Sequence, residues 1–315
     1  MAEPEAPDQS IAVSASGNET KVPGEFPVAG PGAMSLVPQV CSTCGATPAP
    51  NDGATAATRY VYVLGRIKPQ YPDPSVENEV KQAIGRIDSK GLTDRQALHS
   101  LLAKPENRYL VRQICWVMTI AGLETYIVVP RDPVDFSQLV DTLRPTPRPG
   151  EYDLVIGVRG PIASPDMCNG LMVPIVLADQ IYSFHRDELI KAIPRPEKMP
   201  PKEFTHAAEE LFDRVMQITD NAGATDEDRA ATYLMVRYGE IFNKAAEMFA
   251  RNFSLSSVEI HRSSLSALRM IMKVVFSYSS RDKDVKEQFF VLVDVTKMHP
   301  YLQSKLSPYL AIGQT

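Results

Sequence analysis

The sharpest chemical signal in this sequence is the Cys-x-x-Cys pair formed by Cys41 and Cys44. Two thiolates at this spacing can bind one Zn²⁺ at about 2.3 Å per bond, but a closed structural zinc site needs four ligands. The other two cysteines of the chain are Cys115 and Cys168, and Cys168 lies in a turn-forming stretch, residues 167–170, that suits presentation of a thiolate. The sequence therefore predicts a zinc site with the ligands Cys41, Cys44, Cys115 and Cys168.

Two alternatives to zinc stay open for these cysteines. Cys41 and Cys44 have the spacing of a redox dithiol. Cys115 falls in a segment that we expect to be helical, beside Trp116, where an unliganded thiol would act as a small buried apolar side chain. A zinc ion held by four thiolates has no open position for water, so it would be structural and would tie the segment around Cys41 to the folded body.

No complete catalytic constellation can be assembled from the sequence. The segment His206–Glu210 lacks the second histidine that a zincin needs one helical turn away, and no Gly-x-Ser-x-Gly elbow is present. Gly157 and Gly160 lie in a segment without the Gly-Lys-Ser/Thr of a phosphate loop or the third glycine of a dinucleotide-binding loop. We assign no metal-ligand role to any histidine.

Mixed chemistry is concentrated between Arg159 and Met172. This segment combines the charges of Arg159 and Asp166, the amide of Asn169, rigidifying prolines and the adaptable side chain of Met172. Such a loop can hold a peptide through backbone hydrogen bonds and soft apolar contacts, although it could equally be an internal strap. We take Arg159, Asp166, Asn169 and Met172 as the candidate residues for binding a peptide or a partner.

Apolar periodicity predicts an α+β fold, with helices packed on a mixed sheet and with a helix pair and a β-hairpin toward the C-terminus. Gly223 is expected to end one helix, and Thr225 with Asp228 to cap the next. The expected strands are residues 59–67, 125–130, 153–158, 270–279 and 287–295, and short apolar runs cover 171–177 and 180–184. The expected helices are residues 75–87, 93–102, 107–120, 133–143, 201–218 and 226–250.

Composition and charge exclude several classes of protein. Of the 315 residues, 44% are hydrophobic and 23% charged, so the chain is not wholly disordered. A net charge of -5 without a basic run argues against nucleic-acid binding. No stretch approaches the roughly 20 apolar residues of a membrane span, and the acidic N-terminus is unlike a signal peptide. The expected compartment is therefore the cytoplasm.

The chain is expected to contain one folded domain behind an unstructured start. Residues 1–35 are rich in Pro, Gly and Ala, which predicts a disordered arm. Residues 36–57 form the Cys-x-x-Cys knuckle and a linker, and residues 58–315 a single mixed α/β domain. The Pro-rich stretch 194–201 is a linker or a surface strap, and two separate domains joined there are the alternative.

Long runs in the folded part resemble a known family. The segments 106–117, 122–126, 130–133, 155–162, 167–176, 179–184, 193–198 and 210–214 are similar to the C-terminal domain of unknown function of the cyanobactin (patellamide-type) maturation proteases, the PatG family. The multidomain members of this family carry an upstream subtilisin-like protease, whose Asp, His and Ser motifs are not found in this sequence. The resemblance therefore implies an association with a pathway but no catalytic residue.

The resemblance leads to two functional hypotheses. The first is a non-catalytic accessory module of a ribosomal peptide natural product (RiPP) pathway of the cyanobactin type, which recognises a precursor peptide or a peptide-modifying partner enzyme. The sequence leaves open whether the chain forms a homodimer. The second is an enzyme of an undescribed type that acts on peptides, with Arg159, Asp166, Cys168 and Asn169 around its centre.

Overall fold

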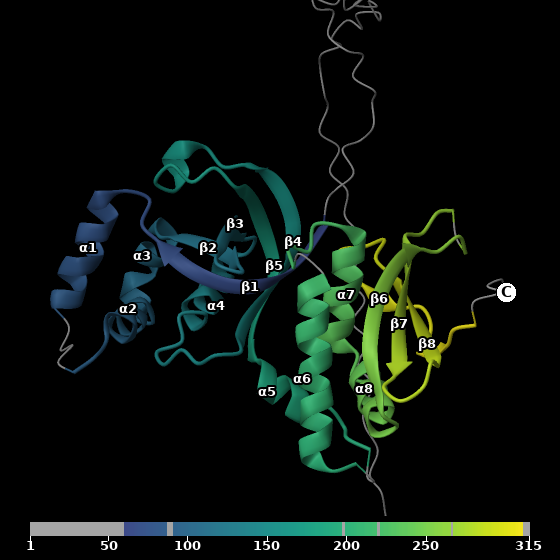
Figure 1. Cartoon of the computed structure of the whole chain (residues 1–315). Helices are drawn as coiled ribbons and strands as arrows, with labels where there is room; N and C mark the ends of the chain where they lie inside the picture. The colour runs from purple at the N-terminus through teal and green to yellow at the C-terminus, as the bar shows by residue number, and fades with distance from the viewer. Residues whose placement is uncertain (1–59, 87–90, 197–198, 219–220, 266, 311–315) are drawn as a thin grey trace, which may run out of the picture. The chain divides into compact units, whose positions relative to one another are not determined.

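A computed structural model describes residues 60–86, 91–196, 199–218, 221–265 and 267–310. All of these belong to one compact unit, residues 56–315 (Figure 1). The expected arm (1–35) and the expected knuckle and linker (36–57) lie outside the described residues.

Five strands close into a barrel in the first half of this unit. They are β1 (Tyr60–Gln70), β2 (Cys115–Ile120), β3 (Leu123–Pro130), β4 (Glu151–Ile162) and β5 (Pro174–His185). Their order around the barrel is β1-β2-β3-β5-β4, with β3 and β5 parallel and all other neighbours antiparallel. β1 pairs with β4 through its first half and with β2 through its second half. This strand order, with a helix between β3 and β4, is that of an OB-type barrel.

Alternating side chains of these strands fill the barrel. Trp116 and Met118 of β2 share one buried cluster with Val128 of β3, Val155 of β4 and Val176 of β5. Helix α4 (Phe136–Asp141) connects β3 to β4 and adds Leu139 and Val140 to that cluster. Helices α1 (Pro74–Gly85), α2 (Asp94–Leu102) and α3 (Arg108–Gln113) lie in the connection between β1 and β2 and contribute to the same cluster.

A second, antiparallel sheet follows in the C-terminal half. Its strands are β6 (Phe253–Arg262), β7 (Ile271–Ser280), β8 (Lys286–Asp294), β9 (Tyr301–Leu302) and β10 (Ser307–Pro308). The order is β10-β8-β7-β6, with β9 also paired to β8. The expected C-terminal hairpin is confirmed as β7 and β8, and within the described part of the chain β6 forms one edge of the sheet.

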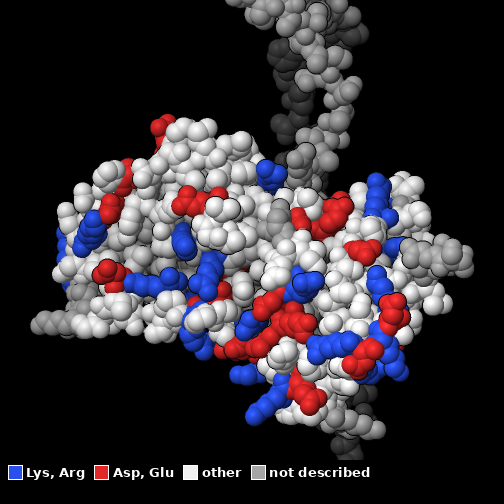
Figure 2. Space-filling view, viewed as in Figure 1, with Lys and Arg blue, Asp and Glu red and all other residues white. Residues whose placement is uncertain are grey.

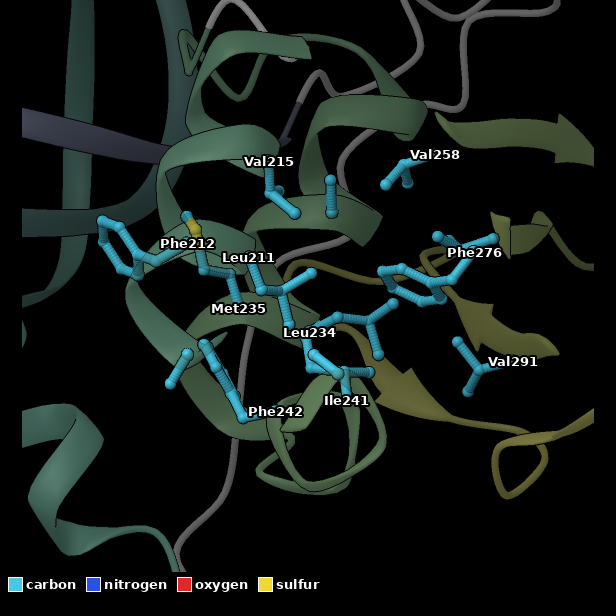
Figure 3. Close-up of a cluster of buried hydrophobic side chains, with 14 of the residues drawn as sticks. Leu211, Phe212, Val215, Leu234, Met235, Ile241, Phe242, Val258, Phe276 and Val291 are labelled. Carbon is cyan, nitrogen blue, oxygen red and sulfur yellow. The ribbon is translucent and has the colours of Figure 1, made fainter. Parts of the chain in front are cut away.

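Helices α5 (Arg186–Ala192), α6 (Pro201–Ile218), α7 (Asp226–Arg237) and α8 (Glu240–Ala250) connect the two β-structures, and Figure 1 shows α6 and α7 between them. One buried cluster joins all three layers. It contains Tyr62 from the outside of the barrel. Phe212 and Leu234 join it from α6 and α7, and Phe276 and Val291 from the second sheet (Figure 3). The predicted α+β class with a mixed sheet is therefore confirmed.

The expected helix over residues 107–120 is wrong. α3 ends at Gln113, the backbone turns extended at Ile114 (φ −71°, ψ 136°), and β2 starts at Cys115. All six residues of β2 are buried because the barrel interior covers one face and a loop covers part of the other. A strand buried on both faces loses the alternation that distinguishes it from a buried helix.

The expected helix over residues 226–250 is also divided. α7 ends at Arg237 and α8 begins at Glu240, with Tyr238 between them in a non-helical conformation (φ −122°, ψ 89°). The Tyr238 hydroxyl accepts a hydrogen bond of 3.1 Å from the backbone N–H of Leu306 near the C-terminus. This long-range contact has no local sequence signal. The two apolar runs around residues 171–184 are likewise one strand, β5, from Pro174 onward.

The bounds of α6 and the cap at the start of α7 agree with the sequence, whereas the role expected of Gly223 does not. The Thr225 hydroxyl accepts a hydrogen bond of 3.1 Å from the Asp228 N–H, as expected of a helix cap. Gly223 does not end α6, which stops at Ile218, and instead its carbonyl accepts a bond of 3.1 Å from the Tyr62 N–H of β1. Among the helices that the structure describes, none is long and apolar enough to cross a membrane.

Candidate functional site

The segment singled out by the sequence forms the end of a two-stranded ribbon made by β4 and β5. Within the described residues, which begin at Tyr60, β1 pairs with β4 as far as the Tyr60–Val158 pair, whereas β4 and β5 stay paired to Ile162 and Pro174. In Figure 1 this ribbon arches from the barrel toward the connection between β1 and α1. Its loop, residues 163–173, connects β4 to β5, which is one of the loops that bind ligands in OB-type barrels, together with the outer face of β2 and β3.

Backbone hydrogen bonds fix the conformation of this loop. The Ala163 N–H donates to the Val173 carbonyl at 2.9 Å and the Gly170 N–H to the Pro165 carbonyl at 2.8 Å. The Asn169 N–H donates to the Pro72 carbonyl at 3.1 Å, which holds the loop to the end of β1. Asn169 itself has a left-handed backbone (φ 45°), a conformation that asparagine tolerates better than most residues. The loop is thus fixed by backbone hydrogen bonds within it and by one to Pro72.

The four candidate binding residues all lie on this ribbon. Arg159 is in its paired part, opposite Val176, and is half-buried. Asp166, Asn169 and Met172 are exposed in the loop. The sequence therefore located a continuous structural feature, although Arg159 lies in the strand and the other three residues in the loop.

The ribbon also exposes apolar side chains that the sequence analysis did not single out. Ile162, Met172 and Leu177 are exposed by 63%, 61% and 42%, and we call them the ribbon patch. Figure 2 shows few charged side chains over this ribbon, whereas acidic and basic groups are interspersed over the rest of that face. Ile162 and Leu177 escaped notice because they occur in strand-forming runs that are typical of buried residues.

The structure brings together two of the four expected zinc ligands, Cys115 and Cys168. The two side chains belong to the same small buried cluster. The Cys115 Sγ also donates to the Met167 carbonyl at 3.2 Å, and the Cys168 Sγ to the Gln70 Oε1 at 3.8 Å. Both thiols are buried, and burial raises the pKa of each. Cys115 comes from β2, and not from a helix as expected, so its side chain reaches the outer face of the barrel beneath the loop.

The thiol pair sits in a small apolar cluster on the outer face of β2, β3 and β5. Val117 and Ile127 are its buried strand members, and the loop contributes Ala163 and Cys168. Half-buried apolar residues border it: Val129, Met167, Leu171, Val173 and Ile175. In the described ranges no three His, Cys, Asp or Glu side chains gather as a metal site would require. Cys41 and Cys44 lie outside those ranges.

Two of the described histidines, His185 and His206, have structural surroundings. His185 caps α5 by accepting a hydrogen bond of 3.2 Å from the Asp187 N–H at its Nδ1, and the His206 ring packs on Phe249 at 5.3 Å between centroids. The hydrogen-bond partners given above for the two thiols include no base. A thiol that is buried without a hydrogen-bonded base is poorly prepared to act as a nucleophile.

A groove also runs along α8, and the sequence analysis did not predict it. The groove has a volume of about 950 Å³. Apolar Met199, Tyr238 and Leu302 line it together with charged Lys244 and Glu247. Because its walls come from α8 and from segments near residues 199 and 302, no local pattern in the sequence could reveal it.

A family model for the PatG domain matches residues 60–268, which is more than half of the chain. The chain belongs to the PatG domain family. A solved structure described as a "PatG Domain of Unknown Function" is similar to this PatG domain with a TM-score of 0.66 and 18% sequence identity, covering 80% of this chain and 99% of that chain. At this identity the similarity shows the fold alone. No curated protein matches the chain.

Proposed function

We propose that this PatG domain is a non-catalytic binding module of a cyanobactin-type peptide maturation pathway, which holds a precursor peptide, or an extended segment of a partner enzyme, on the β4–β5 ribbon. The observation that carries the proposal is the ribbon patch: Ile162, Met172 and Leu177 expose apolar surface on a loop and strand pair whose backbone is already fixed. A fixed binding surface loses little conformational entropy when a ligand binds.

The ribbon offers backbone as well as side-chain contacts. Between Arg159 and Ile162, β4 extends beyond its last pair with the described part of the chain before it, which begins at Tyr60. An extended peptide can add a strand at such an edge, where its main chain is held by hydrogen bonds and its alternate side chains contact apolar residues. Arg159 and Asp166 add one charge of each sign, which would select the polar positions of the peptide.

Binding can be tested with the full chain and synthetic cyanobactin-type precursor peptides carrying a fluorescent label. Anisotropy titration should give saturable binding. Met172→Ser and Arg159→Ala should each weaken it at least about fivefold, which corresponds to roughly 1 kcal/mol per contact. Asn169→Gly removes the amide but keeps the left-handed backbone, and should weaken binding without destabilising the loop.

Leu268→Ser is the matched control, because Leu268 is 94% exposed but lies outside the ribbon. It should leave binding unchanged. Mass spectrometry of the recovered peptide distinguishes binding from catalysis. A peptide of unchanged mass supports the module, whereas a time-dependent mass change with the purified chain alone would contradict it. Binding lost in Lys244→Ala but kept in the ribbon variants would move the site to the α8 groove and refute the ribbon assignment.

A further inference from the structure

We infer that a groove between α3 and α4 binds an acidic polypeptide segment, which inserts one apolar side chain between the two helices and places its carboxylates against the arginines of α3. None of the residues that line this groove lies in the β4–β5 ribbon. The inference therefore does not rest on the proposed function, and its experiment uses a different probe and different variants.

The floor of the groove is apolar. Val111 of α3 and Val140 of α4 line it and are buried, and the half-buried ring of Phe136 lines it as well. Val134, in the short turn before α4, is a further lining residue and is 76% exposed. The groove has a volume of about 160 Å³, and an apolar cavity of about 150 Å³ can hold a benzene molecule. It therefore fits one aromatic or branched aliphatic side chain.

The rim of the groove is basic. Lys104, Arg108 and Arg112 line it, and all three are exposed. Asp141 is the single acidic residue among the lining side chains. Three basic groups and one acidic group give the rim a charge of +2, although the whole chain has a net charge of -5. The groove is thus an electropositive site on an acidic protein.

These three cations are not neutralised by carboxylates of the described residues. The ion pairs that the structure describes involve other lysines, arginines and histidines. Arg112 lies instead over the Phe136 ring, with 5.9 Å between its Cζ and the ring centroid. Arg108 and Arg112 are one turn apart on α3, and like charges at this spacing destabilise a helix. Carboxylates of a bound ligand would offset this repulsion.

Hydrogen bonds fix the α3 wall of the groove. The Trp116 indole N–H donates to the Val111 carbonyl at 2.9 Å, which holds α3 to the barrel. The Asn107 side-chain amide donates to the Leu101 carbonyl at 2.8 Å, which ties the start of α3 to the end of α2. A wall that is already fixed loses little conformational entropy when a ligand binds.

Charge and size together identify the occupant. Arginine guanidinium groups bind carboxylates through parallel N–H donors, so Arg108 and Arg112 favour aspartate or glutamate side chains. The floor takes one side chain of the size of phenylalanine or leucine. A nucleic acid would be opposed by the net charge of the whole chain. The expected ligand is therefore a polypeptide segment with acidic residues on both sides of one large apolar residue.

The test uses the full chain and a fluorescent probe peptide in which two glutamates stand on each side of one phenylalanine. Anisotropy titration should show saturable binding that weakens as the salt concentration rises. Replacement of the phenylalanine by alanine, or of all the glutamates by glutamine, should each weaken binding at least about tenfold. Because these changes are made in the peptide, a folding defect of the chain cannot explain the loss.

Charge reversal in the chain gives the complementary test. Arg108→Glu/Arg112→Glu should weaken binding of the acidic probe at least about tenfold and should bind a probe that has lysines in place of the glutamates. Val134→Ser should weaken binding of the acidic probe at least about twofold, because apolar contact is lost. Lys283→Glu is the matched control, since Lys283 is an exposed cation in the turn between β7 and β8. It should leave binding of the acidic probe unchanged.

Three outcomes would overturn the inference: an acidic probe that does not bind saturably, binding that survives loss of the phenylalanine, or equal binding by Arg108→Glu/Arg112→Glu and the parent chain. Two further outcomes would assign the groove to another occupant and refute this one. An oligonucleotide or phosphatidylserine vesicles that displace the probe as effectively as unlabelled peptide would identify a phosphate ligand. A dimer in analytical ultracentrifugation that Arg108→Glu/Arg112→Glu abolishes would identify a second copy of the chain.

Discussion

At the scale of single residues, the fold depends on close backbone approaches that tolerate no side chain. Gly223 has φ +60°, and a Cβ placed on it would lie 2.2 Å from the Tyr62 carbonyl oxygen. The same segment is bound to β1 by Tyr62 N–H to Gly223 O and Leu64 N–H to Asn221 O, each 3.1 Å. Gly223 thus holds the connection between α6 and α7 against the barrel, a role that its place after a helical pattern did not indicate.

Gly223→Ala should therefore destabilise the protein by at least about 1–2 kcal/mol, because the backbone must move and the left-handed conformation becomes strained. Urea unfolding followed by circular dichroism measures the change. Gly85→Ala is the control, since a Cβ there meets no atom within 4 Å and φ is ordinary. It should be neutral or stabilise the protein by about 0.4–1 kcal/mol. Equal effects of the two substitutions would contradict the close approach.

Asp294 connects pH to stability through its buried carboxylate. Burial opposes its ionisation, but hydrogen bonds from Thr296, from Tyr301 and from Arg269 outweigh burial and lower its pKa. A carboxyl with a lowered pKa in the folded state contributes stability that is present above the unfolded value of about 3.9 and lost as the pH falls through the folded value.

Asp294→Asn should cost about 1–3 kcal/mol near neutral pH, because charge-assisted hydrogen bonds are lost. The difference in unfolding free energy between the two proteins should shrink below about pH 4, when the parent carboxyl takes up its proton. Unfolding curves between neutral pH and the acid limit of folding measure both effects. Asp284→Asn, in the exposed turn between β7 and β8, is the control and should change neither. A difference that grows toward low pH would show the opposite sign of linkage.

At the scale of elements, local signals predicted the helices with caps and the strands with alternation, and failed where burial is two-sided or contacts are distant. Thr93 caps α2 at the start that the sequence predicted. The β7–β8 hairpin lies where its charged turn indicated. β2 failed because every residue in it is buried. Closure of the barrel has no local signal, since it depends on pairing between β1 and β4, whose partners such as Tyr60 and Val158 are about a hundred residues apart.

The candidate site likewise has parts that a local pattern predicted and parts that depend on distant contacts. Its loop could be found because Arg159, Asp166, Asn169 and Met172 are close in sequence. The approach of Cys115 to Cys168 could be proposed only from the number of cysteines, because strand pairing and loop docking, and no local pattern, bring them together.

The cap of α7 gives a test at this scale. Thr225 satisfies the Asp228 N–H of the first turn, which would otherwise lack a partner within the helix. Thr225→Ala should destabilise the protein by about 0.5–2 kcal/mol, whereas Thr225→Ser keeps the hydroxyl and should retain most of the stability. The midpoint of urea unfolding measures both. Equal losses for Ala and Ser would show that the methyl group of Thr225, and not its cap, carries the effect.

At the scale of the whole molecule, one shared core joins the barrel to the second sheet. Tyr62 and Leu154 from the barrel, Phe212 and Leu234 from the helices and Phe276 from the second sheet belong to a single buried cluster. The Pro-rich stretch near residues 194–201 precedes α6 directly, and residues on both of its sides, Ile190 and Phe204, lie in that cluster. We therefore expect the described unit to unfold in one cooperative step.

The single tryptophan makes this cooperativity measurable. Trp116 is 1% exposed inside the barrel, so its fluorescence reports unfolding of the barrel alone. Ile241 is 1% exposed in α8, which packs chiefly on α6 and β6 (Figure 3). Ile241→Val should cost about 0.5–1.5 kcal/mol, or about 1–6 °C in midpoint for a unit of this size. The Trp116 midpoint should fall by the same amount as the midpoint from far-ultraviolet circular dichroism, because a loss in α8 destabilises the barrel through the shared core. Leu268→Val, at a position 94% exposed, should move neither. A Trp116 midpoint that stays in place while the circular dichroism midpoint falls would divide the unit into two independently folding parts.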